Sequence, residues 1–415
     1  RRPWWLDWDW VRRSVRMPRM GKGMNVLLVH NRYRQAGGEE EAFAAESALL
    51  RSQGDRVFEY IEDNRSIRLS AAPSAAVRAI WSFPTVRRLT RLLRVRRPDI
   101  VHFHNTFPLV SPAAYYACRE AGIPVVQTLH NYRLLCPAAT LFRKGRVCES
   151  CLGRWIAWPG VLHRCYRRSA AQSALAAWML ACHRFLGTWR NQVDRYIALS
   201  EFARWKLIQG GLPAGKIAVK PNFVEPDPGP GKGEGAYVLF AGRLSAEKGL
   251  DTLLRAWRRL PRIPLLIAGD GPLFASAVRF ASRPVLEGSI RVLGRRSRAE
   301  LFRLMQGARY LIFPSQWYES FPMVIAEAFA CGRPVLAAGL GAAAEIVEHG
   351  RTGLLVQSGD AEQLADQAHR LWSNPKASRR MGEEARAAFE ENYSARRNYP
   401  RLRQIYAEAL RSRAG

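Results

Sequence analysis

Two cations in the second half of the sequence have a spacing that suits a phosphorylated ligand. Arg243 and Lys248 lie in the turn GRLSAEKG (242–249), between an apolar segment and the helical segment 251–260. A guanidinium binds phosphate oxygens in pairs, an ammonium acts as a point charge, and a helix N-terminus favours anions. The turn therefore predicts a diphosphate site, and a surface loop with two solvated cations is the alternative interpretation.

Two glutamates further along the chain bracket the predicted start of a helix. Glu319 lies in the loop after the apolar segment 309–315, and Glu327 lies on the helix, in whose first turn we expect Pro322. The loop carboxylate can accept hydrogen bonds from sugar hydroxyls, and the helical carboxylate from a ribose. Backbone N–H groups in residues 320–323 lie at the positive helix end, which favours a phosphate between the two. An exposed Glu beside a helix-surface Glu is the alternative.

These residues follow apolar segments that alternate with helical ones along the chain. Near-continuous apolar strands separated by helices are typical of parallel sheets covered on both faces, whose ligands bind at the carboxyl ends of the strands. The predicted fold class is α/β, with two Rossmann-like, doubly wound parallel-sheet domains facing a cleft. The predicted strands are MNVLLVH (24–30), RVFEYI (56–61), DIVHFHN (99–105), PVVQTLHN (124–131), YIALS (196–200) and KIAVKPN (216–222), followed by YVLFAGR (237–243), LLIAGDG (265–271), IRVLGR (290–295), RYLIFPS (309–315), PVLAAG (334–339) and TGLLVQ (352–357).

The 415 residues exceed what one hydrophobic core usually supports, so we expect two domains. Residues 24–224 form the first, a proline- and glycine-rich hinge spans 225–235, and residues 236–394 form the second. A helix over 395–415 is expected to cross back to the first domain. Residues 1–23 are interpreted as a flexible leader, with a Trp-rich basic arm that touches a membrane as the alternative.

Composition limits the classes of protein. Hydrophobic residues make up 48% and charged residues 24%, which excludes a disordered or collagen-like chain. No apolar run approaches the roughly 20 residues that a bilayer helix needs, so we expect a soluble protein. Seven cysteines without a secretory signal favour a reducing cytosol. The net charge of +29 favours anionic partners, although arginines on solvated faces explain part of it.

Four motifs in a fixed order carry a resemblance to a known family. They are GRLSAEKG, GDGP (269–272), Glu319-x7-Glu327 and GAAAEIVEHGRTGLLV (341–356), and the first half adds Gly37-Gly38-Glu39 and PDIVHFHN (98–105). In these motifs residues 24–410 resemble retaining glycosyltransferases of family 4, which have the GT-B fold. The resemblance implies a hexosyltransferase that uses a UDP- or GDP-sugar, retains the anomeric configuration and needs no catalytic metal.

The resemblance also implies roles for single residues. Arg243 and Lys248 would hold the donor diphosphate, Glu319 the transferred sugar and Glu327 the ribose. His130 closes a predicted strand and matches a histidine that hydrogen-bonds the donor sugar near the reacting carbon, although a lone histidine at a strand end is more often structural. The predicted catalytic residues are thus His130 and Glu319. The predicted donor-binding residues are Gly38, Arg243, Lys248, Ser320, Phe321, Pro322 and Glu327.

Two positions depart from the family pattern. Ser320 follows the first glutamate, where the family often has glycine, and GAAAE replaces the usual Gly-Gly run before Glu345. A side chain at position 320 is expected to narrow the sugar pocket. The departure bears on the identity of the donor rather than on the class of reaction.

A short insertion contains four cysteines with metal-ligand spacing. They form C-x11-C-x2-C-x13-C and are Cys136, Cys148, Cys151 and Cys165. His163 lies two residues before the last one. The pattern fits a tetrahedral structural zinc site, and free thiols or a redox pair are the alternatives. Because the insertion (136–165) starts six residues after His130, we expect it to border the cleft on the acceptor side.

Two amphipathic segments lie in the predicted first domain. Residues 84–97 carry six arginines beside an apolar face, and residues 175–189, which include Trp178 and Phe185, repeat apolar side chains at helical spacing. Core packing explains both apolar faces and is preferred for the second, whereas the arginine face of the first is the membrane candidate. We therefore expect a cytoplasmic enzyme, peripheral on the inner face of the cell membrane, with a lipid-linked, polysaccharide or other glycan acceptor.

Other functions explain fewer of these residues. A nucleotide-sugar epimerase or a sugar phosphorylase shares a two-lobed fold, but neither explains Arg243, Lys248, Glu319 and Glu327 together, and no lysine suggests pyridoxal phosphate. The charge of +29 also permits a nucleic-acid-binding protein, but the charge is dispersed and no recognisable module accompanies it. We expect the nucleotide sugar, the acceptor and an anionic membrane surface as partners, and no nucleic acid.

Overall fold

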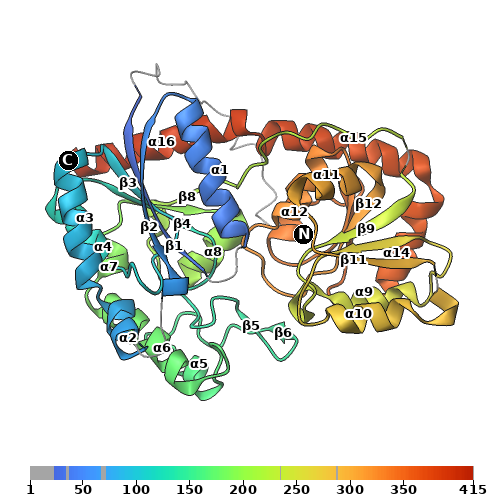
Figure 1. The fold of residues 1–415 in the computed structure, drawn as a ribbon, viewed down its shortest axis with the longest axis horizontal. Coiled ribbons are helices and arrows are strands. Elements are labelled where there is room, and N and C mark those ends of the chain that lie inside the picture. Colours follow the sequence, from blue (N-terminus) through green and yellow to red (C-terminus); the bar gives the residue numbers. More distant parts are fainter. Residues whose placement is uncertain (1–22, 34–36, 67–71, 234, 287, 415) are drawn as a thin grey trace, which may run out of the picture.

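The computed structural model describes residues 23–33, 37–66, 72–233, 235–286 and 288–414. Two six-stranded parallel sheets lie side by side and are flanked by helices (Figure 1). This arrangement confirms the predicted α/β fold with two doubly wound sheets. The predicted leader falls, apart from Gly23, outside the described residues.

The first sheet has the strand order β2-β1-β3-β4-β7-β8, and every neighbouring pair is parallel. Four of its strands are buried along nearly their whole length, as a parallel sheet covered on both faces requires. Each strand predicted for the first half is present. The strands are β1 (Asn25–Arg32), β2 (Arg56–Asp63), β3 (Ile100–Phe103), β4 (Val125–Leu129), β7 (Arg195–Ala198) and β8 (Ile217–Val219).

The second sheet has the order β11-β10-β9-β12-β13-β14 and is also parallel throughout. Its central strand β9 pairs with β10 on one side and β12 on the other, so the loops that follow β9 and β12 lie next to each other. The strands are β9 (Tyr237–Ala241), β10 (Leu265–Ala268), β11 (Ile290–Gly294), β12 (Ala308–Phe313), β13 (Val335–Ala338) and β14 (Gly353–Val356).

Helices connect the strands, and several begin at side-chain caps. Ser200 accepts a hydrogen bond from the backbone of Ala203, and Ser297 and Glu300 form a capping box. The helices of the first half are α1 (Gly38–Ser52), α2 (Ala72–Ile80), α3 (Phe83–Arg96), α4 (Ala114–Glu120), α5 (Trp158–Leu162), α6 (Ala170–Phe185), α7 (Thr188–Asn191) and α8 (Glu201–Gln209). Those of the second half are α9 (Leu250–Trp257), α10 (Phe274–Ala281), α11 (Arg298–Gly307), α12 (Met323–Ala330), α13 (Ala342–Ile346) and α14 (Ala361–Ser373).

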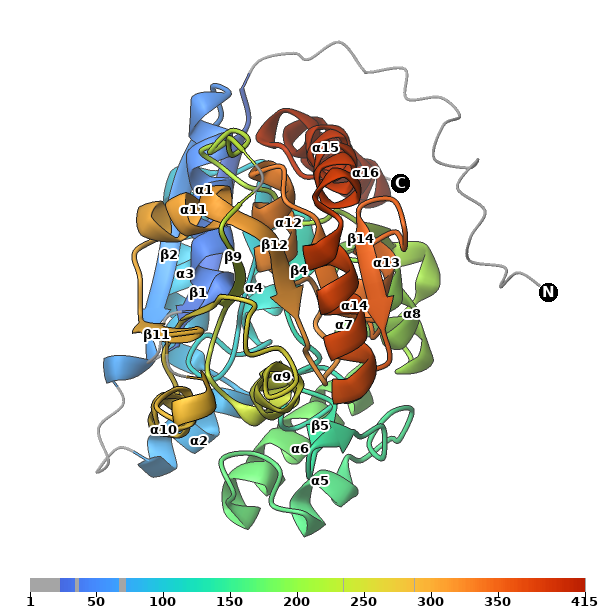
Figure 2. The same cartoon turned by 90° about the vertical axis from the view of Figure 1, so that its right-hand side faces the viewer.

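The last two helices run from one sheet to the other. α15 (Pro375–Asn392) packs against α12 and β12, and α16 (Ala395–Ala414) continues along the first sheet (Figures 1 and 2). The apolar side chains of α16 share a core with residues of β1, β3, β4 and β7. The α16 members of this core are Tyr399, Leu402, Ile405, Tyr406 and Ala409.

The cysteine insertion contains a small antiparallel hairpin that the sequence pattern did not predict, formed by β5 (Phe142–Arg143) and β6 (Arg146–Val147). α5 and α6 follow it. The prediction that residues 175–189 form a core stripe is confirmed for Met179 and Trp189, which are buried, and wrong for Trp178 and Phe185 of α6, which are 60% and 81% exposed. These side chains face outward because α6 directs Ala176 and Leu180 into the core instead. In the described part of the chain, no helix combines the length and the apolar character needed to cross a bilayer.

Candidate active site

The carboxyl end of β4 contacts the loop that follows β12. His130 comes directly after β4, and the Ser320 hydroxyl donates a hydrogen bond to the backbone carbonyl of His130. The backbone carbonyl of Ser320 accepts in turn from the hydroxyl of Ser200, the N-cap of α8, at 2.9 Å. The predicted catalytic histidine and the predicted donor loop are therefore in direct contact, and the residue that replaces the family's glycine makes that contact.

Lys248 and Glu319, predicted to bind diphosphate and sugar, form an ion pair with each other. Lys248 Nζ lies 2.5 Å from Glu319 Oε1. The same oxygen accepts hydrogen bonds from the Trp317 indole at 2.7 Å and from the Ser315 hydroxyl at 3.2 Å. The two groups meet because they follow the neighbouring strands β9 and β12. A cation and a carboxylate for one ligand thus lie at one place and neutralise each other's charge.

The turn after β9 can bring Lys248 this close because glycine follows it. Gly249 has a φ of 71°, and a Cβ atom there would lie 1.8 Å from the carbonyl oxygen of Pro314. Only glycine tolerates both conditions. Arg243, at the start of the same turn, is exposed, and its side chain makes no hydrogen bond or ion pair within the described residues, although its backbone carbonyl accepts from the backbone of Ser245 at 3.0 Å. Its guanidinium is therefore available to an anion, whereas the Lys248 ammonium is shared with Glu319.

Glu327 is buried on α12, and its carboxylate lies 3.6 Å from Arg298 Nε. Burial raises the pKa of Glu327 to about 7; the Arg298 guanidinium offsets part of this effect, and Glu41 of α1 adds to it. A carboxyl that is partly protonated near neutral pH can both donate and accept hydrogen bonds. This behaviour suits a group that faces the hydroxyls of a ribose.

Three of the predicted donor-binding residues make no polar side-chain contact. Phe321 is buried and packs against Tyr393, with ring centroids 5.7 Å apart. Pro322 is the N-cap of α12, one position before the first turn in which we expected it, because the helix begins at Met323. Gly38 begins α1, is exposed, and would bring a Cβ within 4 Å of no atom.

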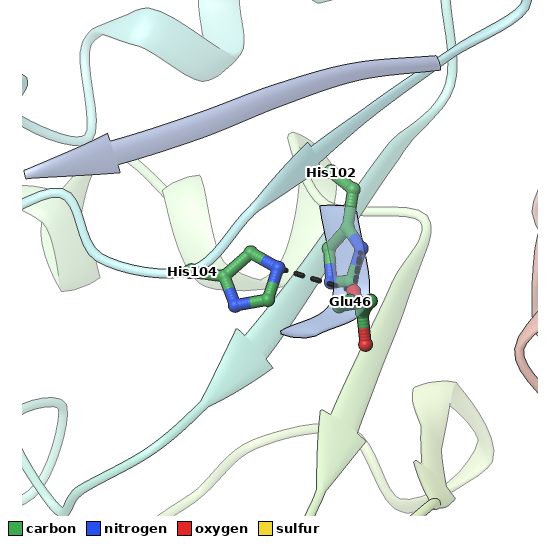
Figure 3. Close-up of side chains that lie close together, drawn as sticks. All are labelled: Glu46, His102 and His104. Carbon is green, nitrogen blue, oxygen red and sulfur yellow. Dashed lines mark hydrogen bonds and ion pairs between the residues drawn. The ribbon is translucent and has the colours of Figure 1, made fainter. Parts of the chain in front are cut away.

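His130 belongs to a buried chain of side chains that sequence reasoning missed. His130 Nε2 lies 3.0 Å from His104 Nδ1, and His104 Nε2 lies 3.1 Å from Glu46 Oε1 (Figure 3 shows the last pair). The two imidazoles stack with centroids 5.2 Å apart. Burial, together with the neighbouring His104 and His30, holds the pKa of His130 well below its ordinary value. His130 is therefore a neutral imidazole whose orientation is set by His104 and Glu46.

Glu46 is the centre of this cluster. Its Oε2 accepts a hydrogen bond from Lys220 at 2.9 Å, and its Oε1 lies 2.9 Å from His102 Nδ1 (Figure 3). Burial alone would raise the pKa of Glu46, but Lys220 and the two histidines outweigh it and hold this pKa well below its ordinary value. Within the described ranges, Glu46, His102 and His104 are the one set of three ligand atoms close enough for a metal. Because Lys220 already supplies a buried positive charge, the cluster is satisfied as an ion pair.

One sequence signal could have found this cluster. His102 and His104 are two residues apart at the end of a buried strand, and a period of two places both side chains on the same face.

A second carboxyl lies nearby: Glu39 accepts a hydrogen bond at 2.5 Å from Asn131, which follows His130. Burial raises the pKa of Glu39 to about 7. The Gly37-Gly38-Glu39 motif therefore delivers a carboxyl, as well as a glycine, to the end of β4.

The four cysteines of the insertion line one small cavity of about 10 Å³, together with His163. All four are free thiols. In the described residues no three of their sulfur atoms lie within 4.8 Å of one another. The structure therefore brings the predicted metal ligands to one place without arranging them as a tetrahedron.

Comparisons with known proteins cover both halves of the chain. Residues 22–228 match the family model described as glycosyltransferase family 4, and residues 225–388 match the model described as glycosyl transferases group 1. A crystal structure of Anabaena HepE in complex with UDP-glucose superposes with a TM-score of 0.64 at 20% identity, and covers 94% of this chain and 100% of that chain. This likeness shows a shared fold.

Two curated relatives illustrate the range of sequence similarity. N-acetyl-alpha-D-glucosaminyl L-malate synthase of Bacillus anthracis is 32% identical over 147 residues, which are 35% of this chain and 38% of that protein. Alpha-D-kanosaminyltransferase of Streptomyces kanamyceticus is 26% identical over 341 residues, which are 79% of this chain and 81% of that protein. Against the first three relatives, the matched part spans 38%, 49% and 48% of their length.

Proposed function

Since the chain belongs to the GT-B glycosyltransferases of family 4, we propose that it moves a sugar from a nucleotide-sugar donor to a glycan or lipid-linked acceptor. The observation that carries this proposal is the contact between the loop of Glu319 and Ser320 and the end of β4 at His130. It brings the loop that carries Glu319, the partner of Lys248, to the backbone of the residue that carries a neutral imidazole. A cation, a carboxylate and a neutral imidazole are the groups that a sugar bound to a diphosphate needs.

In this proposal the donor is held from its diphosphate outward. Arg243 takes the diphosphate first, because its exposed guanidinium has no partner among the described residues. Lys248 supplies the second cation and stays within reach of Glu319, whose remaining acceptor capacity serves the sugar hydroxyls. Glu327, with its raised pKa, hydrogen-bonds the ribose. The UDP-glucose complex of HepE supports a nucleotide-sugar ligand for this fold.

We also propose that the reaction retains the anomeric configuration and needs no catalytic metal. Departure of the nucleoside diphosphate builds negative charge on the phosphate oxygens, and fixed cations such as Arg243 and Lys248 stabilise that charge. His130 is neutral and so acts as a hydrogen-bond partner of the sugar rather than as a charged group. Zinc bound by the four cysteines would take no part in this chemistry, because their cavity lies in the insertion.

The acceptor, in this proposal, comes from an anionic membrane surface at the cytoplasmic side. Trp158, Leu162 and Trp178 line an open apolar groove of about 720 Å³ between α5 and α6. Trp178 and Leu162 are 60% and 66% exposed. The Arg154 guanidinium lies 5.5 Å from the centroid of the Trp158 ring. On α3, Arg87, Arg91 and Arg94 are exposed without an ion pair among the described residues. Aromatic side chains beside arginines suit a lipid interface.

Co-sedimentation with liposomes tests the membrane part. We expect binding to vesicles that contain anionic lipid and its loss at high salt, because the Debye length is only about 8 Å at physiological ionic strength. Replacing Trp178 and Phe185 with Ser, and separately Arg87, Arg91 and Arg94 with Gln, shows which surface docks. Absence of binding at low salt would refute the membrane proposal and leave the transfer proposal intact.

Incubation with a panel of nucleotide sugars tests the transfer itself. We expect release of a nucleoside diphosphate from one donor, faster with a glycan or lipid-linked acceptor, and unchanged by EDTA. An NMR spectrum of the product should show the anomeric configuration of the donor. Conversion of the donor into an epimer without release of the nucleotide would contradict the proposal, and so would a demand for inorganic phosphate.

A further inference from the structure

The four thiols of the insertion converge on one cavity although they are far apart in sequence. Cys136 and Cys151 are buried there, and Cys148 and Cys165 are half-buried. A cavity of about 10 Å³ is at the lower limit for a single water molecule and has room for one ion.

Two of the thiols donate weak hydrogen bonds within the insertion. Cys148 donates to the Ser150 hydroxyl at 3.5 Å, and Cys151 donates to the backbone carbonyl of Ala157 at 3.9 Å. These contacts hold both sulfur atoms beside the cavity that they line. Loss of the thiol protons would make both sulfur atoms available to a metal ion.

The surrounding chain is held in place from α6. The Arg184 guanidinium donates hydrogen bonds to the backbone carbonyls of Leu134 at 3.0 Å and Trp155 at 2.9 Å, and also to that of Arg154. The Arg184 side chain thus holds the backbone just before Cys136 and just after Cys151. These contacts of Arg184 hold the backbone near the cysteines without involving a sulfur atom.

We propose that Cys136, Cys148, Cys151 and Cys165 bind one Zn²⁺, and that the metal fixes Glu149 as a bridge from the insertion to the donor loop. Zn–S bonds of about 2.3 Å place the sulfur atoms of a tetrahedron about 3.8 Å apart, so the side chains rotate inward on binding. His163 also lines the cavity, but it is exposed, and the four thiols complete the coordination without it.

Glu149 lies between two of the proposed ligands and points out of the insertion. Its carboxylate accepts a hydrogen bond from Lys206 Nζ at 2.6 Å and forms another with the Tyr318 hydroxyl. Lys206 is buried and lies 5.2 Å from the centroid of the Tyr318 ring. Tyr318 precedes Glu319, the residue that the proposed function places on the transferred sugar. The metal would therefore set the position of the donor loop through Glu149, and this second half of the inference rests on the proposed function.

Metal analysis of the full chain, purified without chelators, tests the zinc site independently of activity. We expect one zinc per chain in the wild type and in Cys182→Ser and His163→Ala, and a loss of zinc in Cys151→Ser. Cobalt exchanged into the site should show the intense near-ultraviolet band of Co²⁺–thiolate bonds, which reports ligands even where a variant is less stable. Metal-free protein, or a disulfide between cysteines of the insertion, would overturn the proposal.

A comparison with Glu149→Gln tests the bridge. This variant should keep its zinc and raise KM for the donor several-fold, and chelation of the wild type should have a similar effect. Because both changes act through one contact, chelation should add little to the loss in Glu149→Gln. Additive losses, or a Glu149→Gln enzyme with unchanged KM, would show that the metal does not act through Glu149. The zinc count decides the site even if no donor is turned over.

Discussion

The two halves of the candidate site are built in opposite ways. On the first sheet, Glu46 and Lys220 form a buried pair, and hydrogen bonds link Glu46 through His104 to His130. On the second sheet, Arg243 is exposed, and Lys248 and Glu319 form an ion pair whose side chains are 23% and 11% exposed. One half has its polar groups satisfied by protein, whereas the other has charges ready to be shared with a ligand.

This difference predicts that the two halves of the site have different roles. A buried, hydrogen-bonded cluster resists rearrangement, because each group left unpaired in it costs free energy, so it fixes the orientation of His130. The loops of the second sheet can exchange a protein partner for a ligand at a smaller cost, because Arg243 is exposed and the ion pair of Lys248 and Glu319 is only partly buried. Variants in the cluster should therefore act first on folding, and variants in the loops on binding and turnover.

The largest effect is expected for Glu46→Ala. Without the carboxylate, Lys220 is left as an unpaired charge in a position that is 1% exposed, and the free energy of unfolding should fall by about 3–5 kcal/mol. Urea unfolding measures this loss. Glu383→Ala, which breaks the exposed ion pair with Arg379, is the matched control and should cost less than about 1 kcal/mol. Equal losses in the two variants would remove the contrast between a buried and a surface pair.

Glu319→Gln should act on turnover instead. The amide keeps the size of the side chain but loses the charge that faces Lys248 and the sugar, so kcat should fall on the order of 100-fold. Nucleotide affinity, measured by calorimetry, should stay close to that of the wild type, since Glu319 is not placed on the nucleotide. A variant with full turnover would contradict the role of Glu319.

Arg243→Ala and Lys248→Ala should separate binding from turnover within the second half. Loss of a charge-assisted phosphate contact costs about 1.5–3 kcal/mol, so both should weaken nucleotide binding by at least tenfold. Only Lys248→Ala also removes the partner of Glu319, and it should therefore lower kcat as well. The same calorimetry and steady-state kinetics apply to both variants. Unchanged affinity in both would refute the diphosphate site.

The smallest effect is one of pH and has opposite signs in the two halves. The pKa of His102 is lowered by burial to about 4, so its contribution to stability is complete above its ordinary value of 6.5 and is lost as the pH falls toward 4. The pKa of Glu327 is raised to about 7, so its contribution is complete below 4.5 and is lost as the pH rises through 7. Glu327→Gln should therefore stabilise the protein by about 1–2 kcal/mol at pH 8 and hardly at pH 5. Thermal melts at the two pH values check this, and equal shifts would contradict it.

The sequence predicted the strands well and the contacts between distant loops poorly. Each apolar segment of a parallel sheet is long and unambiguous, so all twelve predicted strands are present. The prediction of a core face on α6 was partly wrong, because exposed aromatic side chains on a helix repeat with the same period as buried ones. Lys248 and Glu319 are 71 residues apart, and their pairing depends on β9 and β12 being neighbours, which apolar patterns do not specify. The bond from Ser320 to His130 spans 190 residues and depends on how the two sheets approach each other.

The path of α16 determines the order in which the chain can assemble on the ribosome. Leu402, Tyr406 and Ala409 complete the core on one face of the first sheet, and Asn398 accepts a hydrogen bond from Lys220 at 3.0 Å. A nascent chain emerges from its N-terminus, so the strands of the first sheet leave the ribosome long before this helix exists. Until α16 has emerged, one face of the first sheet lacks its apolar cover. The first half of the chain therefore completes its fold only after this helix has been made.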